Sequence, residues 1–209
     1  MKIALVDTLH SNSRSVERAL LQACEGRPLE VLRTEDPDEL RSADKLVVPG
    51  QGGFGDCLRA LRARGLDQAI VEEVRAGKPF LGICLGLQAL FEASDEAPGV
   101  PGLALLPGRC ERLLAQPGVK IPHMGWNSLK LTGEGHPALT AAGGSGSWFY
   151  FVHSFHAQPA APRLLRACVT HGTQQVTAAI AQDNILATQF HPEKSQQVGL
   201  RLLSAFVSA

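Results

Sequence analysis

Short apolar runs alternate with amphipathic segments through the first half of the chain, and this alternation limits the fold more than any other feature. The runs expected to be strands are residues 3–6, 29–32, 45–48 and 80–83. The segments expected to be helices are residues 12–24, 54–63, 66–76 and 85–91. In the first helix Val16, Leu20 and Cys24 fall on one face, and Asn12 or Ser13 is the expected N-cap. Strands that alternate with helices predict a parallel sheet with helices on both faces.

The second half has a different pattern, in which shorter strand-like runs lie between Pro- and Gly-rich segments. The expected strands are residues 109–113, 126–131, 147–152, 176–181 and 185–190. Residues 94–108 and 133–146 are expected to be loops, and the last helix is expected from about Glu193. No segment is typical of a linker. We therefore expect residues 1–209 to form a single domain of the α/β class, with a mostly parallel central sheet flanked by helices and extra antiparallel strands in the second half.

Charge and composition exclude several classes of protein. The 209 residues include 20 Lys and Arg and 20 Asp and Glu, so the formal net charge is zero. A neutral chain without a basic tract lacks the electrostatic footprint of a nucleic-acid or anionic-membrane binder. The longest apolar stretch, residues 79–91, is broken by Gln88 and is shorter than the ~20 residues of a membrane span. With no secretory leader visible, we expect a cytoplasmic protein that binds neither nucleic acid nor membrane.

The cysteines and histidines do not have the spacing of a metal site. The five cysteines, an odd number, include no Cys-x-x-Cys pair, so we expect neither a zinc site nor a disulfide framework, which fits a reducing cytosol. No two histidines have the spacing of ligands on one helix turn. His153 and His156 flank an aromatic strand, where they could line a pocket. We expect no metal and no cofactor.

Cys84 is the one cysteine that lies in a motif with chemical meaning. The segment 82–86 (GICLG) has the Gly-x-nucleophile-x-Gly pattern of a nucleophile elbow, at the junction of a buried strand and a helix. Glycines on both sides remove Cβ atoms that would clash in such a tight turn. The following helix N-terminus favours a thiolate, and the N–H of Leu85 can face an oxyanion. The alternative is a structural cysteine between two glycines that permit close packing.

His191 and Glu193 follow the last expected strand, with Pro192 between them. A thiolate nucleophile needs a base that later protonates the leaving group, and imidazole is the usual choice. A carboxylate two residues away could orient that imidazole and support its positive charge. The alternative is that His191 caps the C-terminal helix, with Glu193 in its first turn.

A glycine-rich segment follows the third expected strand. Residues 50–55 (GQGGFG) match the dinucleotide-binding pattern formally, but that fingerprint belongs to the first strand of a fold and requires an acidic residue at the end of the next strand. Here the next strand ends at Cys84. We therefore interpret Gly50, Gln51 and Gly52 as a flexible backbone beside Cys84, whose N–H groups could complete an oxyanion hole.

Together these motifs resemble a known enzyme family. The segments GICLGLQ (82–88), HPEKS (191–195) and PGQG (49–52) are similar to the class I, or triad, glutamine amidotransferases. PHMGWN (122–127) and FVHSF (151–155) narrow the resemblance to the glutaminase subunits of imidazole glycerol phosphate synthases, over essentially the whole chain. Such enzymes have a flavodoxin-like or α/β-hydrolase-like fold. Leu9 and Ser11 stand where this family usually has glycine, Gln51 where it is often apolar, and Phe155 where Tyr is common; none of these departures touches the triad.

The resemblance implies a function in histidine biosynthesis. The subunit would hydrolyse L-glutamine to glutamate and ammonia without a cofactor, and would pass the ammonia to a separate (β/α)8-barrel cyclase subunit in a heterodimer. Cys84 would be the nucleophile, His191 the acid and base, and Glu193 its orienting group. The remaining roles implied by the resemblance are oxyanion binding by the backbone of Leu85 and of residues 50–53, binding of the glutamine head by Gln88, Ser154 and Phe155, and cyclase binding by Pro122, Met124, Trp126 and Lys194.

Other functions remain open at this point. Another amidotransferase subunit, feeding a different synthase, would share Cys84, His191 and Glu193, although residues 122–127 favour the histidine-pathway subunit. A cysteine hydrolase that acts alone on small amides would turn over without any partner. A non-catalytic interaction module would bind normally after loss of Cys84.

Overall fold

The computed structural model describes residues 1–7, 12–24 and 26–209; Leu9 and Ser11, noted in the sequence, lie outside the described residues. The strands are β1 (Lys2–Val6), β2 (Glu30–Thr34), β3 (Lys45–Gly50), β4 (Phe80–Cys84), β5 (Ala93–Ser94), β6 (Gly108–Arg112), β7 (His123–Ser128), β8 (Lys130–Leu131), β9 (Trp148–His153), β10 (Phe155–Pro159), β11 (Leu165–His171), β12 (Gln174–Gln182) and β13 (Ile185–Thr188). The helices are α1 (Ser13–Ala23), α2 (Pro37–Ser42), α3 (Phe54–Ala63), α4 (Leu66–Arg75), α5 (Leu85–Gln88), α6 (Pro137–Ala141) and α7 (Gln196–Ser208), with 3-10 turns η1 (Pro162–Leu164) and η2 (Pro192–Lys194).

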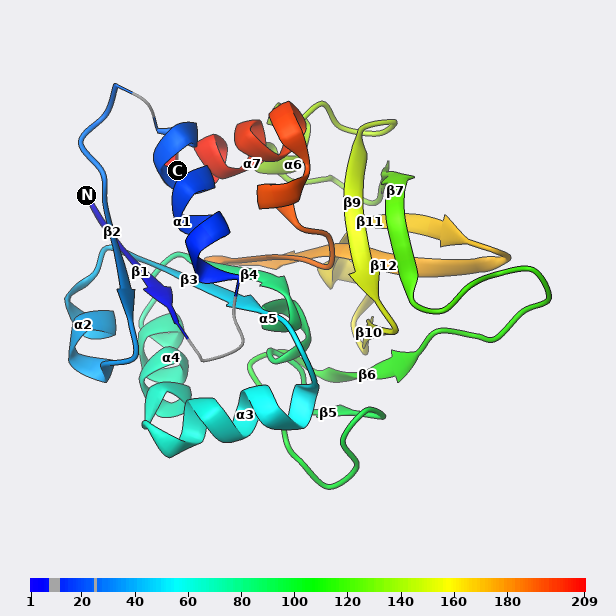
Figure 1. The fold of residues 1–209 in the computed structure, drawn as a ribbon, viewed down its shortest axis with the longest axis horizontal. Coiled ribbons are helices and arrows are strands. Elements are labelled where there is room, and N and C mark those ends of the chain that lie inside the picture. The colour runs from blue at the N-terminus through cyan, green and yellow to red at the C-terminus, as the bar shows by residue number, and fades with distance from the viewer. Residues whose placement is uncertain (8–11, 25) are drawn as a thin grey trace.

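The central sheet has the strand order β2-β1-β3-β4-β13-β12-β11-β8 (Figure 1). Neighbouring strands from β2 to β13 are parallel, and the three that follow β13 are antiparallel. The expected α/β class, with a mostly parallel sheet and extra antiparallel strands, is confirmed. In the pairing of β3 with β4, Gly50 lies opposite Cys84, and in that of β13 with β4, Thr188 lies opposite Ile83. The carboxyl ends of β3, β4 and β13 therefore meet at one edge, where ligands bind in open α/β sheets.

Helices cover both faces of this sheet, as the alternating pattern predicts. Ile3 and Leu5 of β1 pack into the apolar cluster that includes α1 and α7, whereas Ala4 and Val6 pack into the cluster that includes α2, α3 and α4. Figure 1 shows α1 and α7 on one side and α3 and α4 on the other. Since alternate residues of a strand point to opposite faces, a continuously apolar strand serves both clusters. No helix in the described part of the chain is long and apolar enough to cross a membrane.

Several boundaries differ from those expected. The third strand continues through Pro49 to Gly50, because Pro49 lies in register with Ile83 and the proline ring does not end the pairing. The helix after Cys84 ends at Gln88, not Phe91. The carbonyl groups of residues 89–91 instead accept hydrogen bonds from backbone N–H groups of residues 103–106. These carbonyl groups are therefore not available to continue the helix.

The second half contains elements that the sequence did not predict. The expected loop at 133–146 includes the short helix α6, in which His136 caps the N-terminus through the Ala138 N–H. Strands β10 and β11 were also missed. The expected strand 126–131 is divided between β7 and β8, and the last helix begins at Gln196 after the turn η2. In addition to the central sheet, β7 pairs with β9, and β10-β6-β5 form a small sheet.

Candidate active site

Cys84 is the last residue of β4 and has the backbone geometry expected of a nucleophile elbow. Its φ of 55° and ψ of −103° are unusual for a non-glycine residue and indicate local strain. The two flanking glycines permit close approach of neighbouring backbone. A Cβ on Gly86 would lie 1.9 Å from the Val48 carbonyl oxygen, and one on Gly82 would lie 2.7 Å from the Gly86 carbonyl oxygen. The steric reason predicted for both glycines is confirmed.

The other four cysteines are buried, unpaired thiols that do not line the cavity beside Cys84. Burial raises the pKa of the Cys57 thiol to about 12, and it also raises the pKa values of Cys24, Cys110 and Cys168. A thiol with a raised pKa is poorly nucleophilic at neutral pH. These residues act as small apolar packing groups.

His191 and Glu193 form a buried ion pair next to Cys84. The Nδ1 of His191 lies 2.7 Å from the Glu193 Oε1, and neither side chain is more than 2% exposed. The backbone of His191 is fixed as well, because its N–H donates to the Tyr150 carbonyl oxygen and its carbonyl accepts from the Ser195 hydroxyl. The imidazole makes no capping hydrogen bond to η2. His191 does stand at the N-cap position of η2, with Glu193 in the first turn, but its imidazole faces the Glu193 carboxylate and does not cap the turn.

Asn12 takes part in the same cluster. The residue does stand at the N-cap position of α1, as predicted, but its side chain makes no capping hydrogen bond. Its Nδ2 instead donates to the Glu193 Oε1 at 3.1 Å, the oxygen that also faces His191. Two donors on one carboxylate oxygen fix the rotamer of Glu193 and, through it, the imidazole plane.

The charge state of His191 follows from its surroundings. Burial alone would lower the pKa of His191, but the nearby Cys84, and then Glu193, outweigh burial and raise the pKa to about 10. Such a shift favours the protonated imidazolium form of His191. Within the described residues the buried Nε2 of His191 has no hydrogen-bond partner, so this nitrogen is available to a reacting group.

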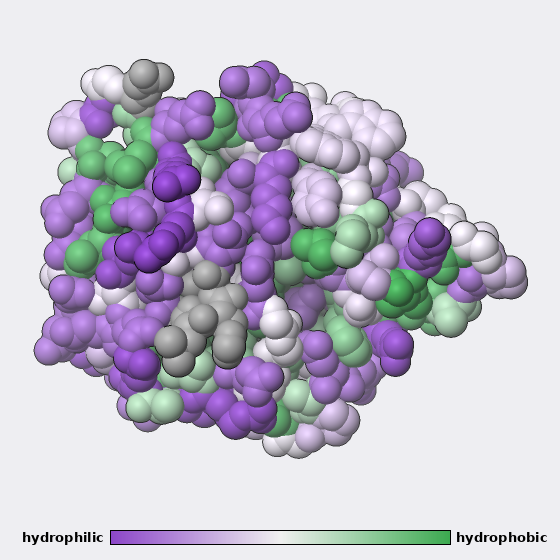
Figure 2. All heavy atoms as spheres, viewed as in Figure 1, coloured by the Kyte–Doolittle hydropathy of each residue, from purple (hydrophilic) through white to green (hydrophobic). Residues whose placement is uncertain are grey.

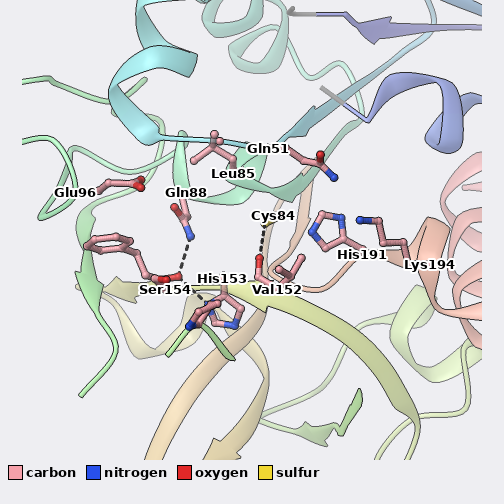
Figure 3. A pocket seen from close by; sticks show the side chains of 13 residues that line it. Gln51, Cys84, Leu85, Gln88, Glu96, Val152, His153, Ser154, His191 and Lys194 are labelled. Carbon is pink, nitrogen blue, oxygen red and sulfur yellow. Dashed lines mark hydrogen bonds between the residues drawn. The ribbon is translucent and has the colours of Figure 1, made fainter. Parts of the chain in front are cut away.

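A cavity of about 420 Å³ opens beside Cys84 and His191 (Figure 3). Its walls combine residues from the carboxyl ends of the strands with the β9–β10 connection. The lining residues are Gln51, Gly52, Cys84, Leu85, Gln88, Glu96, Pro122, Val152, His153, Ser154, Phe155, His191 and Lys194. Figure 3 shows Cys84 and His191 close to each other, and a dashed line marks the hydrogen bond from the Gln88 amide to the Phe155 carbonyl oxygen.

Most residues expected around the nucleophile do line this cavity. Gln51, Gly52, Leu85 and Gln88 are among them, whereas Gly50 lies behind Leu85, with no room for a Cβ. Gly52 has a φ of 88°, a conformation that suits glycine. The two remaining head-group candidates, Ser154 and Phe155, also line the cavity.

The glycine-rich segment at 50–55 does not form a dinucleotide site. Gly53 stands at the N-cap of α3, and the first N–H group of that helix, from Phe54, donates to the Glu96 carboxylate at 2.8 Å. Glu96 was not singled out in the sequence, since it lies in an irregular loop without a motif. Among the described residues that line the cavity, it is the one carboxylate.

The histidines outside the triad are divided between two surroundings. His153 lines the cavity, as expected, but His156 does not; it is completely buried and contacts the Gln174 amide. Burial lowers the pKa of both, to about 3 for His153 and about 4 for His156. Among the described residues, no three of His, Cys, Asp and Glu lie close enough together to hold a metal ion.

The four residues expected at a partner interface lie on one side of the cavity. Pro122 and Lys194 line the cavity itself. Met124 and Trp126 are 63% and 43% exposed on β7, and Trp126 packs edge-on against Tyr150 of β9. Figure 2 shows pale and green residues gathered at the right-hand side of the viewed face, over β7 and β9. The cavity and this exposed surface are thus continuous through Pro122 and Lys194.

Comparison with known sequences assigns this arrangement to a family. The family model for glutamine amidotransferase class-I matches residues 4–208. Three cyanobacterial proteins named imidazole glycerol phosphate synthase subunit HisH are similar over nearly their whole length. That of Nostoc punctiforme is 48% identical over 99% of this chain and 95% of its own. That of Synechococcus sp. strain JA-3-3Ab is 46% identical over 99% and 93%, and that of Acaryochloris marina is 44% identical over 98% and 93%.

Solved structures share the fold at much lower sequence identity. A structure described as a glutamine amidotransferase superposes with a TM-score of 0.74 at 20% identity, over 99% of this chain and 97% of the other. The structure of PurLQS from Thermotoga maritima gives 0.71 at 19% identity, over 99% of this chain and 97% of the matched one. The expected class I amidotransferase fold is confirmed.

Proposed function

The chain belongs to the class I glutamine amidotransferases, in the family of imidazole glycerol phosphate synthase subunit HisH, and on this premise we propose that residues 1–209 act as one glutaminase domain that supplies ammonia to a cyclase. The observation that carries the proposal is the placement of Cys84, on a strained elbow, beside the buried His191–Glu193 pair at one cavity. The family hydrolyses L-glutamine in histidine biosynthesis.

Cys84, His191 and Glu193 divide the chemistry among them. The Cys84 thiolate attacks the amide carbon, and the electron pair of the carbonyl moves to oxygen, giving a tetrahedral intermediate. The N–H of Leu85 and an N–H from residues 50–52 stabilise that oxyanion. His191 gives its proton to the departing nitrogen, so that ammonia leaves and a thioester remains. His191 then takes a proton from water, which hydrolyses the thioester and restores the thiolate. Glu193 keeps the imidazole oriented throughout.

The opposite side of the cavity suits the amino-acid head of glutamine. The Glu96 carboxylate can pair with the α-ammonium group. Both N–H groups of the Gln88 amide donate hydrogen bonds within the protein. One goes to the Phe155 carbonyl oxygen at 2.9 Å and the other to the Gln189 Oε1 at 3.1 Å. Its remaining oxygen can only accept, so Gln88 serves the ammonium and not the carboxylate of the substrate. Backbone N–H groups near Ser154 and Phe155 are the donors proposed for the carboxylate.

The partner is a cyclase subunit, which we propose to be a (β/α)8 barrel that forms a heterodimer with this chain. Pro122, Met124, Trp126 and Lys194 form the proposed docking surface, and because two of them line the cavity, ammonia can leave there without crossing the core. The aromatic and methionine side chains are typical interface anchors. The unpaired buried cysteines support a cytoplasmic location.

Glutamate release tests the proposal. The purified chain is assayed alone, and then with a cyclase and the nucleotide-like ligand of that cyclase. We expect weak activity alone and a rise of about two orders of magnitude or more in the complex, because one repaired oxyanion donor can supply that much. Cys84→Ala should abolish the activity, whereas the matched control Cys57→Ala, a buried thiol away from the cavity, should retain it. The proposed function would be contradicted if Cys84→Ala kept its activity. It would also be contradicted if the wild-type complex released no glutamate.

A further inference from the structure

Gln189 is a completely buried polar residue that the triad chemistry does not use. It follows β13 directly, and its backbone N–H donates to the Ala178 carbonyl oxygen at 2.8 Å. The side-chain Nε2 lies 3.5 Å from the Cys84 Sγ, within reach of an N–H···S hydrogen bond. A buried amide beside a nucleophilic sulfur is a candidate for a role in the reaction because a charged sulfur gains more from an N–H donor than a neutral one does.

The orientation of the Gln189 amide is set by its neighbours. The Gln88 Nε2 lies 2.9 Å from the Phe155 carbonyl oxygen, which can only accept, so this atom of Gln88 must be the nitrogen. The same nitrogen lies 3.1 Å from the far end of the Gln189 amide, which must therefore be the oxygen. The remaining end of Gln189, facing Cys84, is the NH₂ group. A flipped amide would place an oxygen against the sulfur and two N–H groups against each other.

The Phe155 carbonyl is held from a second side by a chain of hydrogen bonds. The His153 Nδ1 lies 2.9 Å from it and therefore carries the proton. The His153 Nε2 then accepts from the His123 Nδ1 at 3.1 Å, and the His123 Nε2 accepts from the Asn127 Nδ2 at 3.2 Å. The Asn127 amide is itself oriented by the Thr170 carbonyl oxygen, at 2.9 Å. The acceptor that orients Gln88 thus has little freedom to move.

On the premise that Cys84 is the nucleophile of a glutaminase, we propose that Gln189 is a further catalytic residue, which donates an N–H to the Cys84 sulfur and stabilises the thiolate. Gln88 is the positioning residue that holds the Gln189 amide in the donating orientation. Gln189 exchanges no proton. Its donor is strongest when the sulfur is charged, before attack and again when the thioester breaks and the sulfur leaves with its electron pair.

The test is the rate at which iodoacetamide alkylates Cys84 between pH 5 and 9, followed by peptide mapping in the full chain. Gln189→Met removes the donor and keeps a side chain of similar length. Because a hydrogen bond to a charged group favours the charged form by about tenfold or more, the rate–pH profile should move about one unit toward alkaline pH, and alkylation on the acidic limb of the profile should fall by about tenfold. Gln189→Glu keeps the shape and an acceptor for Gln88, but places oxygen against sulfur, so the shift should be larger.

A matched control separates this effect from simple loss of a buried amide. Asn184 precedes β13 at the opposite edge of the sheet, and its amide donates to the Val74 and Lys78 carbonyl oxygens. Asn184→Leu should leave the alkylation profile of Cys84 unchanged. Gln88→Met should give a smaller alkaline shift than Gln189→Met, because the Gln189 amide is then free to turn. Circular dichroism confirms that each variant compared is folded.

A wild-type profile in folded Gln189→Met or Gln189→Glu would overturn the inference. This outcome differs from failure of the proposed function, since alkylation needs neither glutamine nor a partner. If the wild-type complex does not hydrolyse glutamine but the Gln189 variants still shift the profile, the donor role stands and the glutaminase does not. If glutamine is hydrolysed and the alkylation profile of the Gln189 variants does not move, the glutaminase function stands and the donor role of Gln189 does not.

Discussion

Three buried histidines should make this protein unfold more easily as the pH falls below 6.5. His123, His153 and His156 are at most 6% exposed, and burial lowers their pKa values to about 4, 3 and 4. The unfolded chain has the ordinary histidine pKa of about 6.5. Between these values the unfolded chain binds more protons than the folded one, so stability is present above pH 6.5 and is lost as the pH falls.

The size of the effect follows from proton linkage. At pH 5.5 each of these histidines takes up about 0.9 proton on unfolding, which is worth about 1.2 kcal/mol per pH unit. From pH 7 to pH 5 the loss is about 2 kcal/mol for each of the three histidines. A total of about 5–6 kcal/mol is a large share of the 5–15 kcal/mol that stabilises a typical domain. His191 acts in the opposite direction, because its raised pKa keeps the folded state protonated at pH 7 while the unfolded chain is mostly neutral there; this offsets about 1 kcal/mol of the loss.

Urea unfolding from pH 5 to 7, followed by circular dichroism, measures this slope. His156→Gln removes one titrating ring that does not line the cavity and should lower the slope by about 1.2 kcal/mol per pH unit near pH 5.5. Asn184→Ala, which removes a part-buried amide without a titrating group, should lower stability at every pH and keep the slope. If His156→Gln and the wild type gave the same slope, the assignment of His156 as a buried neutral ring would be refuted.

Three further substitutions probe the site. Asn12→Leu removes the second hydrogen-bond donor to Glu193. Since a hydrogen bond to a charged group is lost, the glutaminase kcat should fall about tenfold with little change in KM. A kcat equal to that of the wild type would show that Asn12 does not orient the triad. Gly86→Ala places a Cβ 1.9 Å from the Val48 carbonyl oxygen and should sharply lower the thermal unfolding temperature, whereas Gly53→Ala, with its nearest atom at 3.5 Å, should not. Gly52→Val, at a φ of 88°, should reduce activation by the cyclase more than it weakens association, measured by calorimetry; the opposite order would place Gly52 in the interface.

Local periodicity predicted most of the first half of the fold, although it missed the short helix α2 and placed the end of α5 too late. The helix at residues 54–63 has the predicted bounds, and the strands that carry Cys84 and precede His191 were both expected. Their side chains meet because the carboxyl ends of β4 and β13 lie next to each other, a consequence of parallel topology. The sequence motifs predicted that Cys84 and His191 react together, and the order of strands in the sheet places them side by side.

The missed features depend on contacts between distant parts of the chain. Asn12 has the sequence signature of a helix cap, and only the fold places its amide against Glu193, 181 positions away. Gln189 was interpreted as part of an apolar strand, because no local pattern marks an amide that points at a sulfur. Helix α6 was hidden among glycines that favour turns. Strand β10 ends at Pro159, a residue that usually argues against a strand.

The central claim is that Cys84 makes ammonia for a partner, and one measurement tests it most directly. The complex of Cys84→Ala with the cyclase is assayed for cyclase product with glutamine, and separately with ammonium ions, as the nitrogen source. The account predicts that synthesis from glutamine is lost while synthesis from ammonium equals that of the wild-type complex, because only the source of ammonia has been removed. Undiminished synthesis from glutamine in that complex would contradict the assignment of Cys84 as the nucleophile.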